Sequence, residues 1–582
     1  MTIPLRELEF DLFEVLRPRA LEVATVREVL VAAAELARRE FAPHAAEADA
    51  DEPRIVQGKV VLPAATGRAL AAHAEAGFLS MGFAPEHGGL GMPFVVSQAC
   101  SALFAAAHVG SFSYALLTQG AANVIVHFGT DAQRAHYLPP MLAGRWFGTM
   151  CLSEPQAGSS LADVRTLAEP HADGTYRIRG QKMWISGGEH ELGDNIVHLV
   201  LARTPQAPPG VKGLSLFIVP RRRDGRDNGV RLLGLNHKMG WRGHVNTAIS
   251  FGEEVECAGE LVGELHRGLA HMFLLMNEAR VGIGLAASAL GFAGYRYALN
   301  YARERHQGRA LETRDPLAPQ VPIIRHADVR RMLLSQKAWV EGALDLVLYC
   351  ATLVDTQAAG DEAAQRNAQA LLELLTPVVK SWPSEWCLEA NKLAIQVAGG
   401  AGYTRDLPLE RLYRDNRLNP IHEGAYGIHG LDLLGRKVGL AGGGAYQAYA
   451  DAVLAALDAA RPHEALREFV AALGDALGAL TQVTRHLTQT AASGAAPLAL
   501  ANATVYLDAF GTVTIAWRWL ARAQVALEAQ RTATSAAERD FYAGKLAACR
   551  HFFRHDLSRT AAQFELLAGL DDTALTVTDE QF

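Results

Sequence analysis

Hydrophobic residues recur at three- and four-residue spacing over most of this chain, and one stretch in the middle follows a different pattern. In "VREVLVAAAELARREFAPHAAEAD" charged residues fall between the apolar positions, as on an amphipathic helix. Clusters such as "APEHGGLGMP" separate segments of this kind. We therefore predict an N-terminal helical domain over residues 1–145.

The pattern changes at about residue 146. Short β-branched runs broken by Gly, Pro and Asn follow, such as "TYRIRGQKMWIS", "NIVHLVLAR", "GLSLFIVP" and "NTAISF"; they predict a small β domain over residues 146–265. Helical spacing returns over residues 266–445, until "GLAGGGAYQAY" interrupts it, because three successive glycines are poor in a helix interior. The predicted fold class is mostly α with a small middle β domain.

Residues 446–582 read as an additional C-terminal helical domain. In "LANATVYLDAFGTVTIAWRWLARAQVALEAQ" apolar residues surround much of the helix circumference, so we expect a helix that is buried on more than one side. The segment "RDFYAGKLAACRHFFRHDLSRTAAQFELLAG" is amphipathic and could pair with it antiparallel. We expect this region to cover the rest of the protein and strengthen an oligomer, without supplying a catalytic residue.

Length, composition and charge exclude several classes of protein. At 582 residues the chain exceeds one hydrophobic core, and its 49% hydrophobic and 20% charged residues are those of an ordinary globular protein. A net charge of -7 gives no basic surface for nucleic acid. Six scattered cysteines without a CxxC pair argue against disulfides or a structural zinc site. The acidic N-terminus does not resemble a signal peptide, and the uncharged run 281–295 is too short to span a bilayer. We expect a cytoplasmic protein without a metal.

One motif is misleading. Gly282, Gly284 and Ala287 in "VGIGLAA" fit the G-x-G-x-x-A pattern of dinucleotide-binding sites. That pattern requires a preceding strand, whereas "GLAHMFLLMNEAR" reads as a helix. We expect these small residues to serve close helix packing instead.

Two stretches contain residues suited to a cofactor. In "MCLSEPQAGSSLADVRTLAEP", Gly158 and Ser159 offer backbone N–H groups and a hydroxyl to an anion or polar group. In "GQKMWISGGEH", Trp184 precedes a Gly-Gly turn, where its indole could lie against a flat ring. On these residues alone, a loop with a core tryptophan is an equal alternative.

A third stretch, "RDNRLNPIHEGAYGIHG", places one carboxylate, Glu423, among small residues and directly before a glycine. An exposed turn glutamate is the simplest interpretation.

Several of these motifs occur together in one order. "CLSEPQAGSS", "KMWIS" and "QVAGGAGYTRDLPLERLYRDNRLNPIHEG", with the helical–β–helical order, resemble the acyl-CoA dehydrogenase family over about residues 30–440. The flanks "GEHELGDNIVHLVLARTPQAPPGVKGLSLFIVP", "HKMG" and "MFLLMNEARVGIG" look like the 3-methylmercaptopropionyl-CoA dehydrogenase subgroup. The resemblance implies FAD, an acyl-CoA substrate, an electron-transfer flavoprotein as electron acceptor, and a homodimer or larger oligomer.

The resemblance also implies roles for individual residues. Glu423 matches the base that takes the α-proton of the acyl-CoA while the β-hydrogen leaves as hydride to the flavin, giving a trans-2-enoyl-CoA. The residues that match FAD contacts are Cys151, Leu152, Ser153, Gly158, Ser159, Trp184, Ile185, Ser186, Arg305, Gln307, Gln396, Gly399, Gly400, Ala425 and Gly427. Five of these would reach FAD across a subunit interface: Arg305, Gln307, Gln396, Gly399 and Gly400. The residues that match substrate contacts are Ser159, Asn277, Arg280 and Gly424.

Some positions depart from the family pattern. Ser153 and Ser186 replace threonines but keep a hydroxyl, Ser160 and Asn277 replace aspartates, and Ala425 replaces a threonine and loses one polar contact. The acyl group is open, with 3-(methylthio)propanoyl-CoA, medium and long chains as candidates. The alternative functions are a flavin oxidase on the same fold and a non-catalytic flavoprotein that binds nucleic acid or a partner through its C-terminal region.

Overall fold

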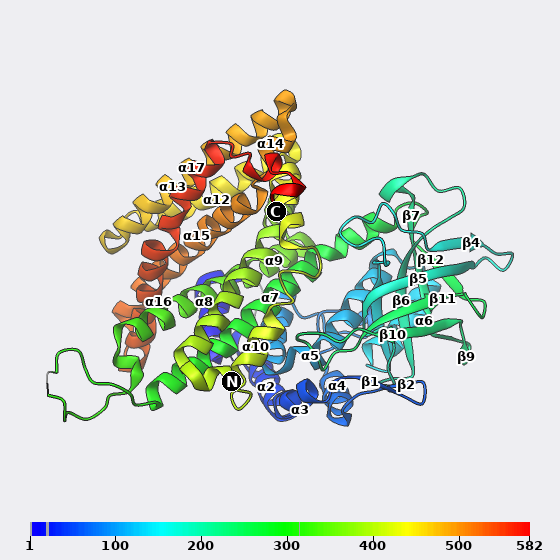
Figure 1. Ribbon diagram of the computed structural model, residues 1–582, viewed down its shortest axis with the longest axis horizontal. Coiled ribbons are helices and arrows are strands. Elements are labelled where there is room, and N and C mark those ends of the chain that lie inside the picture. The colour runs from blue at the N-terminus through cyan, green and yellow to red at the C-terminus, as the bar shows by residue number, and fades with distance from the viewer. Residues whose placement is uncertain (1–2, 19–21, 314) are drawn as a thin grey trace. The chain divides into compact units, whose positions relative to one another are not determined.

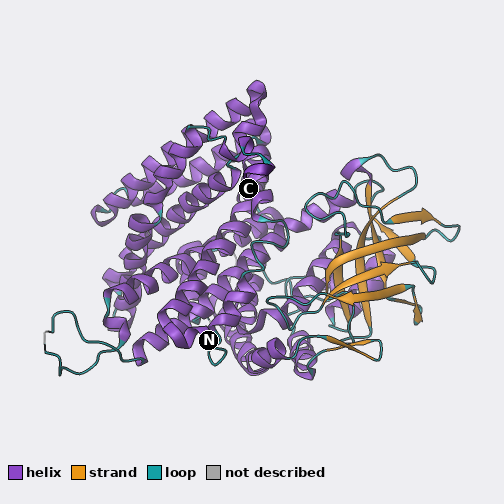
Figure 2. Cartoon of the chain, viewed as in Figure 1, coloured by secondary structure: helices purple, strands orange, loops and turns teal. Residues whose placement is uncertain are grey.

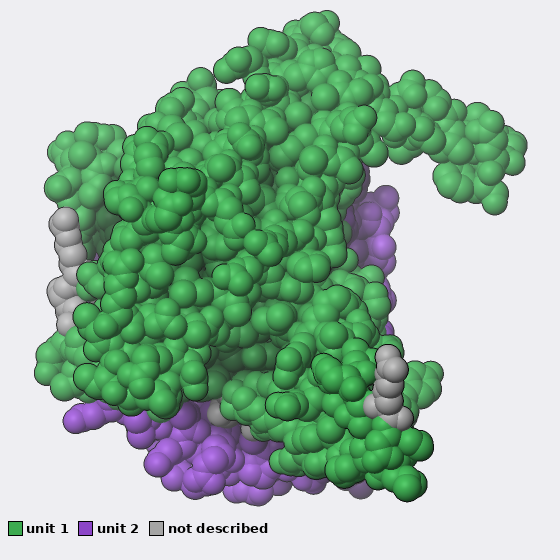
Figure 3. All heavy atoms as spheres, turned by 90° about the vertical axis from the view of Figure 1, so that its left-hand side faces the viewer, with its two compact units in different colours: residues 1–27, 280–582 green, residues 28–279 purple. Residues whose placement is uncertain are grey.

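The computed structural model describes residues 3–18, 22–313 and 315–582, and it leaves the side chains of residues 273–277 undescribed. The chain forms two compact units: residues 28–279 make one, and residues 1–27 together with 280–582 make the other (Figure 3). The predicted class is confirmed, since helices dominate (Figure 2) and all strands except β1 and β2 lie between residues 146 and 262. The domain boundaries near residues 145, 265 and 445 remain predictions.

The unit of residues 28–279 contains an eight-stranded sheet in the order β10-β11-β5-β12-β7-β6-β3, with β4 paired to β5 and β6 (Figure 1). Most neighbouring strands are antiparallel, but β3 runs parallel to β6, with Cys151 opposite Val200. The strands are β3 (Trp146–Cys151), β4 (Leu167–Pro170), β5 (Tyr176–Ser186), β6 (Asn195–Arg203), β7 (Leu214–Pro220), β10 (Val230–Leu235), β11 (Asn246–Phe251) and β12 (Ala258–Val262), with a separate small pair of β8 (Arg222–Arg223) and β9 (Arg226–Asp227).

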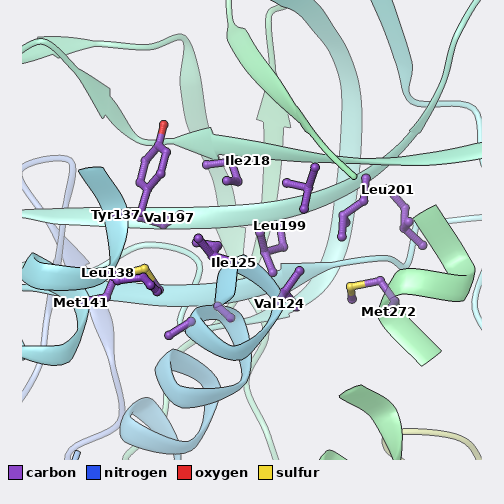
Figure 4. Close-up of a cluster of buried hydrophobic side chains, with 14 of the residues drawn as sticks. Val124, Ile125, Tyr137, Leu138, Met141, Val197, Leu199, Leu201, Ile218 and Met272 are labelled. Atoms are coloured by element: carbon purple, nitrogen blue, oxygen red, sulfur yellow. The ribbon is translucent and has the colours of Figure 1, made fainter. Parts of the chain in front are cut away.

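Helices of the same unit cover the sheet. Val124, Ile125 and Met141 from helices pack against Val197 and Leu199 of β6 in one hydrophobic cluster (Figure 4). The apolar face that the strand pattern predicts is therefore buried by helices. The helices are α2 (Val23–Leu36), which crosses the unit boundary, α3 (Ala45–Ala50), α4 (Ala64–Glu75), α5 (Phe94–Phe128) and α6 (Asp131–Leu142).

Two features of this unit were not predicted. A hairpin of β1 (Arg54–Val56) and β2 (Lys59–Val61) lies within the predicted helical domain. Its turn residues Gln57 and Gly58 both have positive φ, at 51° and 77°, as a tight two-residue hairpin turn requires. Helix α5 is long and apolar enough to cross a membrane, but 89% of its apolar window is buried inside the protein, as in a core helix.

The other unit is helical. Helices α8 and α9 are long and form an extensive pair (Figure 1). Helices α10 and α11 pack against α9. The helices are α1 (Leu5–Glu9), α7 (Gly268–Glu304, counted in this unit from Arg280), α8 (Ala327–Ala359), α9 (Glu362–Ala398), α10 (Leu409–Asn416), α11 (Tyr426–Asp432), α12 (Gly444–Ala460), α13 (Arg467–Thr490), α14 (Ala496–Leu500), α15 (Ala503–Thr532), α16 (Ala536–His555), α17 (Thr560–Ala568) and α18 (Thr573–Thr576).

The C-terminal helices form as the sequence predicts. Helix α15 is buried at every position from Ala509 to Leu520, so it is covered on all sides. Helix α16 follows after a short turn and packs against it, which makes the two antiparallel. The misleading glycine motif lies within α7, where the Cβ of a side chain at Gly284 would be 2.0 Å from the Val379 carbonyl oxygen of α9. Small residues at this place do serve close helix packing.

A network of buried charges joins the N-terminal segment to α8, α15 and α16. The Arg522 guanidinium lies 3.2 Å from Asp11 and 3.4 Å from Glu341, and the Lys545 ammonium lies 2.8 Å from Glu341 and contacts Glu7. Phe10 packs with apolar residues of α15 and α16 at the same place. Residues 3–16 are therefore part of the helical unit, although the other unit, residues 28–279, separates them from the rest of it in the sequence.

Candidate active site

Glu423 lies in the turn between α10 and α11, and its backbone is left-handed, with φ of 53°. Gly424 follows with φ of 96°, so two successive residues have positive φ. Such a conformation is unfavourable for a residue with a side chain, by roughly 1–3 kcal/mol, and persists only where the surroundings enforce it. The turn that carries the carboxylate is therefore held by its neighbours.

Two buried side chains hold the carbonyl groups of this turn. His429 of α11 donates from Nε2 to the carbonyl oxygen of Glu423 at 3.1 Å. Lys380 of α9 donates from Nζ to the carbonyl oxygen of Gly424 at 2.7 Å. Glycine is required at 424 for space as well, because a Cβ there would lie 2.7 Å from the His429 Nε2. The turn is thus fixed from two helices.

The Glu423 side chain is only partly buried, but protein atoms surround its carboxyl closely enough to disfavour the charged form. Burial raises the pKa of the Glu423 carboxyl above its usual range, and the charges of Arg280 and Lys380 oppose this rise. Among the described residues, no cation forms an ion pair with this carboxylate. The group is accessible and is more basic than a solvated glutamate, which is what a general base requires.

The cations near Glu423 are engaged elsewhere. Arg280 of α7 is 6% exposed and lies 3.7 Å from the Asp432 carboxylate of α11. The Lys380 ammonium is directed at the Gly424 carbonyl. The charge of Arg280 acts on the Glu423 carboxyl. Its role as a substrate contact stays a prediction, and the side chain of Asn277 falls outside the described residues.

The backbone N–H of Glu423 has no acceptor among the described residues, although the N–H groups of His422 and Tyr426 on either side are bonded to Leu418 and Pro420. An N–H in a partly buried turn without a partner can bind an incoming oxygen. A carboxyl base and an N–H donor therefore belong to one residue.

In the other unit, Cys151 ends β3 and residues 152–159 form a loop beside the end of β5. The Ser153 carbonyl accepts from the Met183 N–H at 3.0 Å, and the Leu152 carbonyl accepts from the Lys182 ammonium at 3.0 Å. Cys151 is fully buried, so its thiol is not a surface group, while Gly158 and Ser159 are exposed. The structure brings the two predicted flavin segments together.

Glu154 organises this loop. Its carboxylate accepts from the Arg165 and Thr166 N–H groups, from the Thr166 hydroxyl at 2.6 Å and from Lys182 at 2.9 Å. Burial disfavours its charge, but Lys182 and these hydrogen bonds outweigh burial and lower the pKa of Glu154 to about 2. The loop is held by a buried ion pair between Glu154 and Lys182.

Trp184 lies in a β-bulge. Between the pairs Ile185–Thr247 and Lys182–Ile249, strand β5 has two residues opposite one of β11. Trp184 has φ of 64°, and its indole is 60% exposed. A bulge redirects a side chain away from the regular alternation, here outwards from the sheet. This large apolar surface is available to a flat ligand.

The adjoining residues differ in accessibility. Ile185 is buried in the sheet core and offers its backbone, since its carbonyl accepts from the Thr247 hydroxyl at 2.9 Å. Ser186 is partly exposed, and its hydroxyl accepts from the Asn246 amide at 3.1 Å.

The remaining predicted cofactor residues lie at two further places. Exposed residues follow α7 (Arg305 and Gln307) and end α9 (Gln396, Gly399 and Gly400), whereas Ala425 and Gly427 lie at the start of α11, beside Glu423. Arg305 follows Arg280 by 25 positions, which is roughly 37 Å along a helix. The structure does not bring Arg305 to the Glu423 turn.

The sequence interpretation missed four residues that shape these sites: Lys380, His429, Glu154 and Lys182. A lysine within the apolar run "TPVVKSW" is a signal of a buried cation that needs a partner. No comparable signal marks the other three. Among the described residues, no group of three or more His, Cys, Asp and Glu side chains could hold a metal ion.

Four family profiles match successive parts of the chain. They are the N-terminal domain of acyl-CoA dehydrogenases at residues 24–145, the middle domain at 149–253, the C-terminal domain at 266–438, and an acetyl-CoA dehydrogenase C-terminal-like domain at 447–578. Together they cover most of the chain.

Curated relatives match over nearly the whole length. A 3-methylmercaptopropionyl-CoA dehydrogenase of Ruegeria pomeroyi is 36% identical over 99% of both chains. A broad-specificity linear acyl-CoA dehydrogenase of Mycobacterium tuberculosis is 33% identical, again over 99% of both.

Solved structures share the fold. An acyl-CoA dehydrogenase from Bacillus anthracis, complexed with FAD, has a TM-score of 0.77 at 20% identity and covers 97% of this chain and 93% of its own. Caenorhabditis elegans ACDH-11, in complex with C11-CoA, has a TM-score of 0.74 at 18% identity and covers 99% and 93%. With the profiles and the full-length relatives, these matches show that the chain belongs to the acyl-CoA dehydrogenase family, whose members are FAD-dependent oxidoreductases.

Proposed function

We propose that Glu423 is the base with which this enzyme dehydrogenates an acyl-CoA thioester to a trans-2-enoyl-CoA. The observation that carries this assignment is the Glu423 turn: a partly accessible carboxyl with a raised pKa, without an ion-pair partner among the described residues. In the reaction the α C–H bond breaks and its proton passes to the Glu423 carboxylate, while a double bond forms between Cα and Cβ. When bound, FAD accepts the β-hydrogen as hydride.

The Glu423 backbone assists this proton transfer in our proposal. The α-proton of a thioester is acidic only if the negative charge that develops on the carbonyl oxygen is stabilised. The Glu423 N–H, which has no acceptor among the described residues, is a donor for that oxygen. Removing one such donor from an enzyme typically slows the reaction by about 100- to 1,000-fold.

The residues at β3 and β5 fit a flavin. The exposed Trp184 indole offers a flat apolar surface, and no atom lies within 4 Å of the place where a Gly158 Cβ would be, so a ligand can approach that backbone closely. Leu152, Ser153, Ser159, Ile185 and Ser186 would hold the flavin and its chain through backbone groups and hydroxyls.

We further propose a homo-oligomer in which the exposed residues Arg305, Gln307, Gln396, Gly399 and Gly400 meet FAD bound by another subunit. The distance of roughly 37 Å between Arg280 and Arg305 along α7 supports a separate role for the latter. The electron acceptor would be an electron-transfer flavoprotein, and the protein would be cytoplasmic.

The acyl group is proposed to be 3-(methylthio)propanoyl, since the 36% identical relative is named for this substrate. Because another relative is named for broad specificity towards linear acyl chains, a panel of acyl-CoA substrates is needed to test this assignment. The FAD-loaded enzyme would be mixed with 3-(methylthio)propanoyl-CoA and with linear acyl-CoAs of increasing length, and flavin bleaching would be followed. Faster reduction by any linear chain would overturn the substrate assignment. Rapid reoxidation by oxygen would favour an oxidase.

A further inference from the structure

Lys380 is a fully buried lysine in the middle of α9, with 0% exposure. Other buried lysines of this chain face carboxylates: Lys545 contacts Glu341 and Glu7, and Lys182 contacts Glu154. Lys380 forms no ion pair within the described part of the chain, and its Nζ donates to a backbone carbonyl, that of Gly424, at 2.7 Å. Burying an ammonium without a counter-ion is unfavourable by several kcal/mol, so this arrangement requires an explanation.

The carbonyl that Lys380 binds belongs to the turn of the base. Glu423 and Gly424 have successive positive φ values of 53° and 96°. Such a backbone conformation persists only where neighbouring groups hold it. His429 holds the carbonyl of Glu423, and Lys380 holds that of Gly424. Release of the second would let the turn relax towards common backbone angles and would move both the carboxyl and the N–H of Glu423.

The charge of Lys380 also acts on this site. Burial lowers the pKa of Lys380 to about 7, and the charge of Glu423 opposes the decrease. Conversely, Arg280 and Lys380 favour the ionised form of Glu423. The other groups near the turn are His422, which burial keeps neutral, and His429 and Asp432 of α11.

We propose that Lys380 is a positioning residue for the base, which holds the Gly424 carbonyl and thereby presents the carboxyl and the N–H of Glu423 to the substrate. This inference rests on the proposed role of Glu423. It assigns to Lys380 an effect on the rate of proton transfer and little effect on substrate affinity.

The test compares Lys380→Met, which keeps the length but removes the donor and the charge, with Lys380→Gln, which keeps a donor without charge. Lys437→Met is the matched control, because Lys437 is also buried on this unit but pairs with Glu373 at 3.4 Å, away from the turn. Each full-length, FAD-loaded variant is mixed with butanoyl-CoA or 3-(methylthio)propanoyl-CoA, whichever reduces the wild type faster. Flavin reduction is followed as a function of substrate concentration and of pH.

We expect Lys380→Met to slow flavin reduction at saturating substrate by about 100-fold, as a small misplacement of a reacting group does. The substrate dissociation constant should change less than about 3-fold, which separates positioning from binding. Lys380→Gln should recover part of the rate, and Lys437→Met should be as fast as the wild type. Since the Lys380 charge favours ionised Glu423, the rate of Lys380→Met should rise with pH over a higher range than that of the wild type.

The outcomes distinguish the two proposals. If the wild type reduces its flavin and Glu423→Gln does not, but both Lys380 variants are as fast as the wild type, the inference for Lys380 is wrong and the base assignment stands. If Glu423→Gln is also fast, the base assignment is wrong. If neither Lys380 variant folds while Lys437→Met does, a positioning role is contradicted. Lys380 would then contribute to the stability of the fold only.

Discussion

Two glutamates of the helical unit, Glu341 and Glu423, show how the same side chain becomes either a structural charge or a base. Glu341 is 1% exposed and contacts Lys337, Lys545 and Arg522. Burial alone would raise its pKa, but these three cations outweigh burial and lower the pKa to about 2. Glu423 also experiences burial, and its pKa is raised.

The difference lies in where the cations are directed. At Glu341 they point at the carboxylate, whereas at Glu423 Arg280 is bound to Asp432 and Lys380 to a backbone carbonyl. Burial by itself therefore does not identify a base. A buried carboxylate becomes one when the cations around it are occupied by other partners and the carboxyl remains accessible.

The largest effect is expected from Glu423→Gln, which keeps the shape of the side chain but cannot accept a proton. Flavin reduction by an acyl-CoA should fall by about 10,000-fold, the upper range for a general base. Stopped-flow absorbance of the FAD-loaded protein would measure it, and the flavin content should be unchanged. Reduction at near wild-type rate would mean that another residue is the base.

The second largest effect is expected at Glu341, on stability and not on rate. Glu341→Gln leaves Lys545, Lys337 and Arg522 buried with one carboxylate fewer, and breaking such a network typically costs about 3–5 kcal/mol. Urea denaturation would measure the loss, and the folded variant should reduce its flavin at the wild-type rate. A slow but stable variant would show that the network serves the chemistry.

A smaller effect is expected from Gly424→Ala. A Cβ at this position would lie 2.7 Å from His429 Nε2, and φ of 96° disfavours alanine. We expect flavin reduction to slow by about 10- to 100-fold, since such backbone strain is on the order of 1–3 kcal/mol. Gly478→Ala in α13 is the control, because no atom lies within 4 Å of the place where its Cβ would be.

The smallest effect is expected in the pH dependence of stability, where the two glutamates should act in opposite directions. The native pKa of Glu423 is raised, so its contribution to stability falls as pH rises from the unfolded pKa of about 4.3 through the native value. The native pKa of Glu341 is about 2, so its contribution is present above about 4.3 and is lost as pH falls through about 2. Denaturation curves of the wild type and of each Gln variant between pH 2 and 8 would measure the differences, and slopes of the same sign would contradict the comparison.

The sequence by itself determined the order of helical and β regions, because amphipathic spacing and β-branched runs are local properties of the chain. It also indicated that α15 is buried on several sides, and its motifs led to Glu423 and to the loop at residues 151–159. It did not predict the hairpin at Arg54–Val61, although Gln57-Gly58 between apolar runs is a weak turn signal.

The tertiary structure alone decided the features that give these residues their chemistry. The bulge that turns Trp184 outwards depends on the register between β5 and β11, which are 60 residues apart in the sequence. The N-terminal segment lies in the helical unit because Glu7 and Asp11 meet Lys545 and Arg522 from the far end of the chain. Whether a glutamate can act as a base depends on whether the cations near it bind its carboxylate or other groups. Those cations and their partners come from different helices, so no local sequence pattern predicts the outcome.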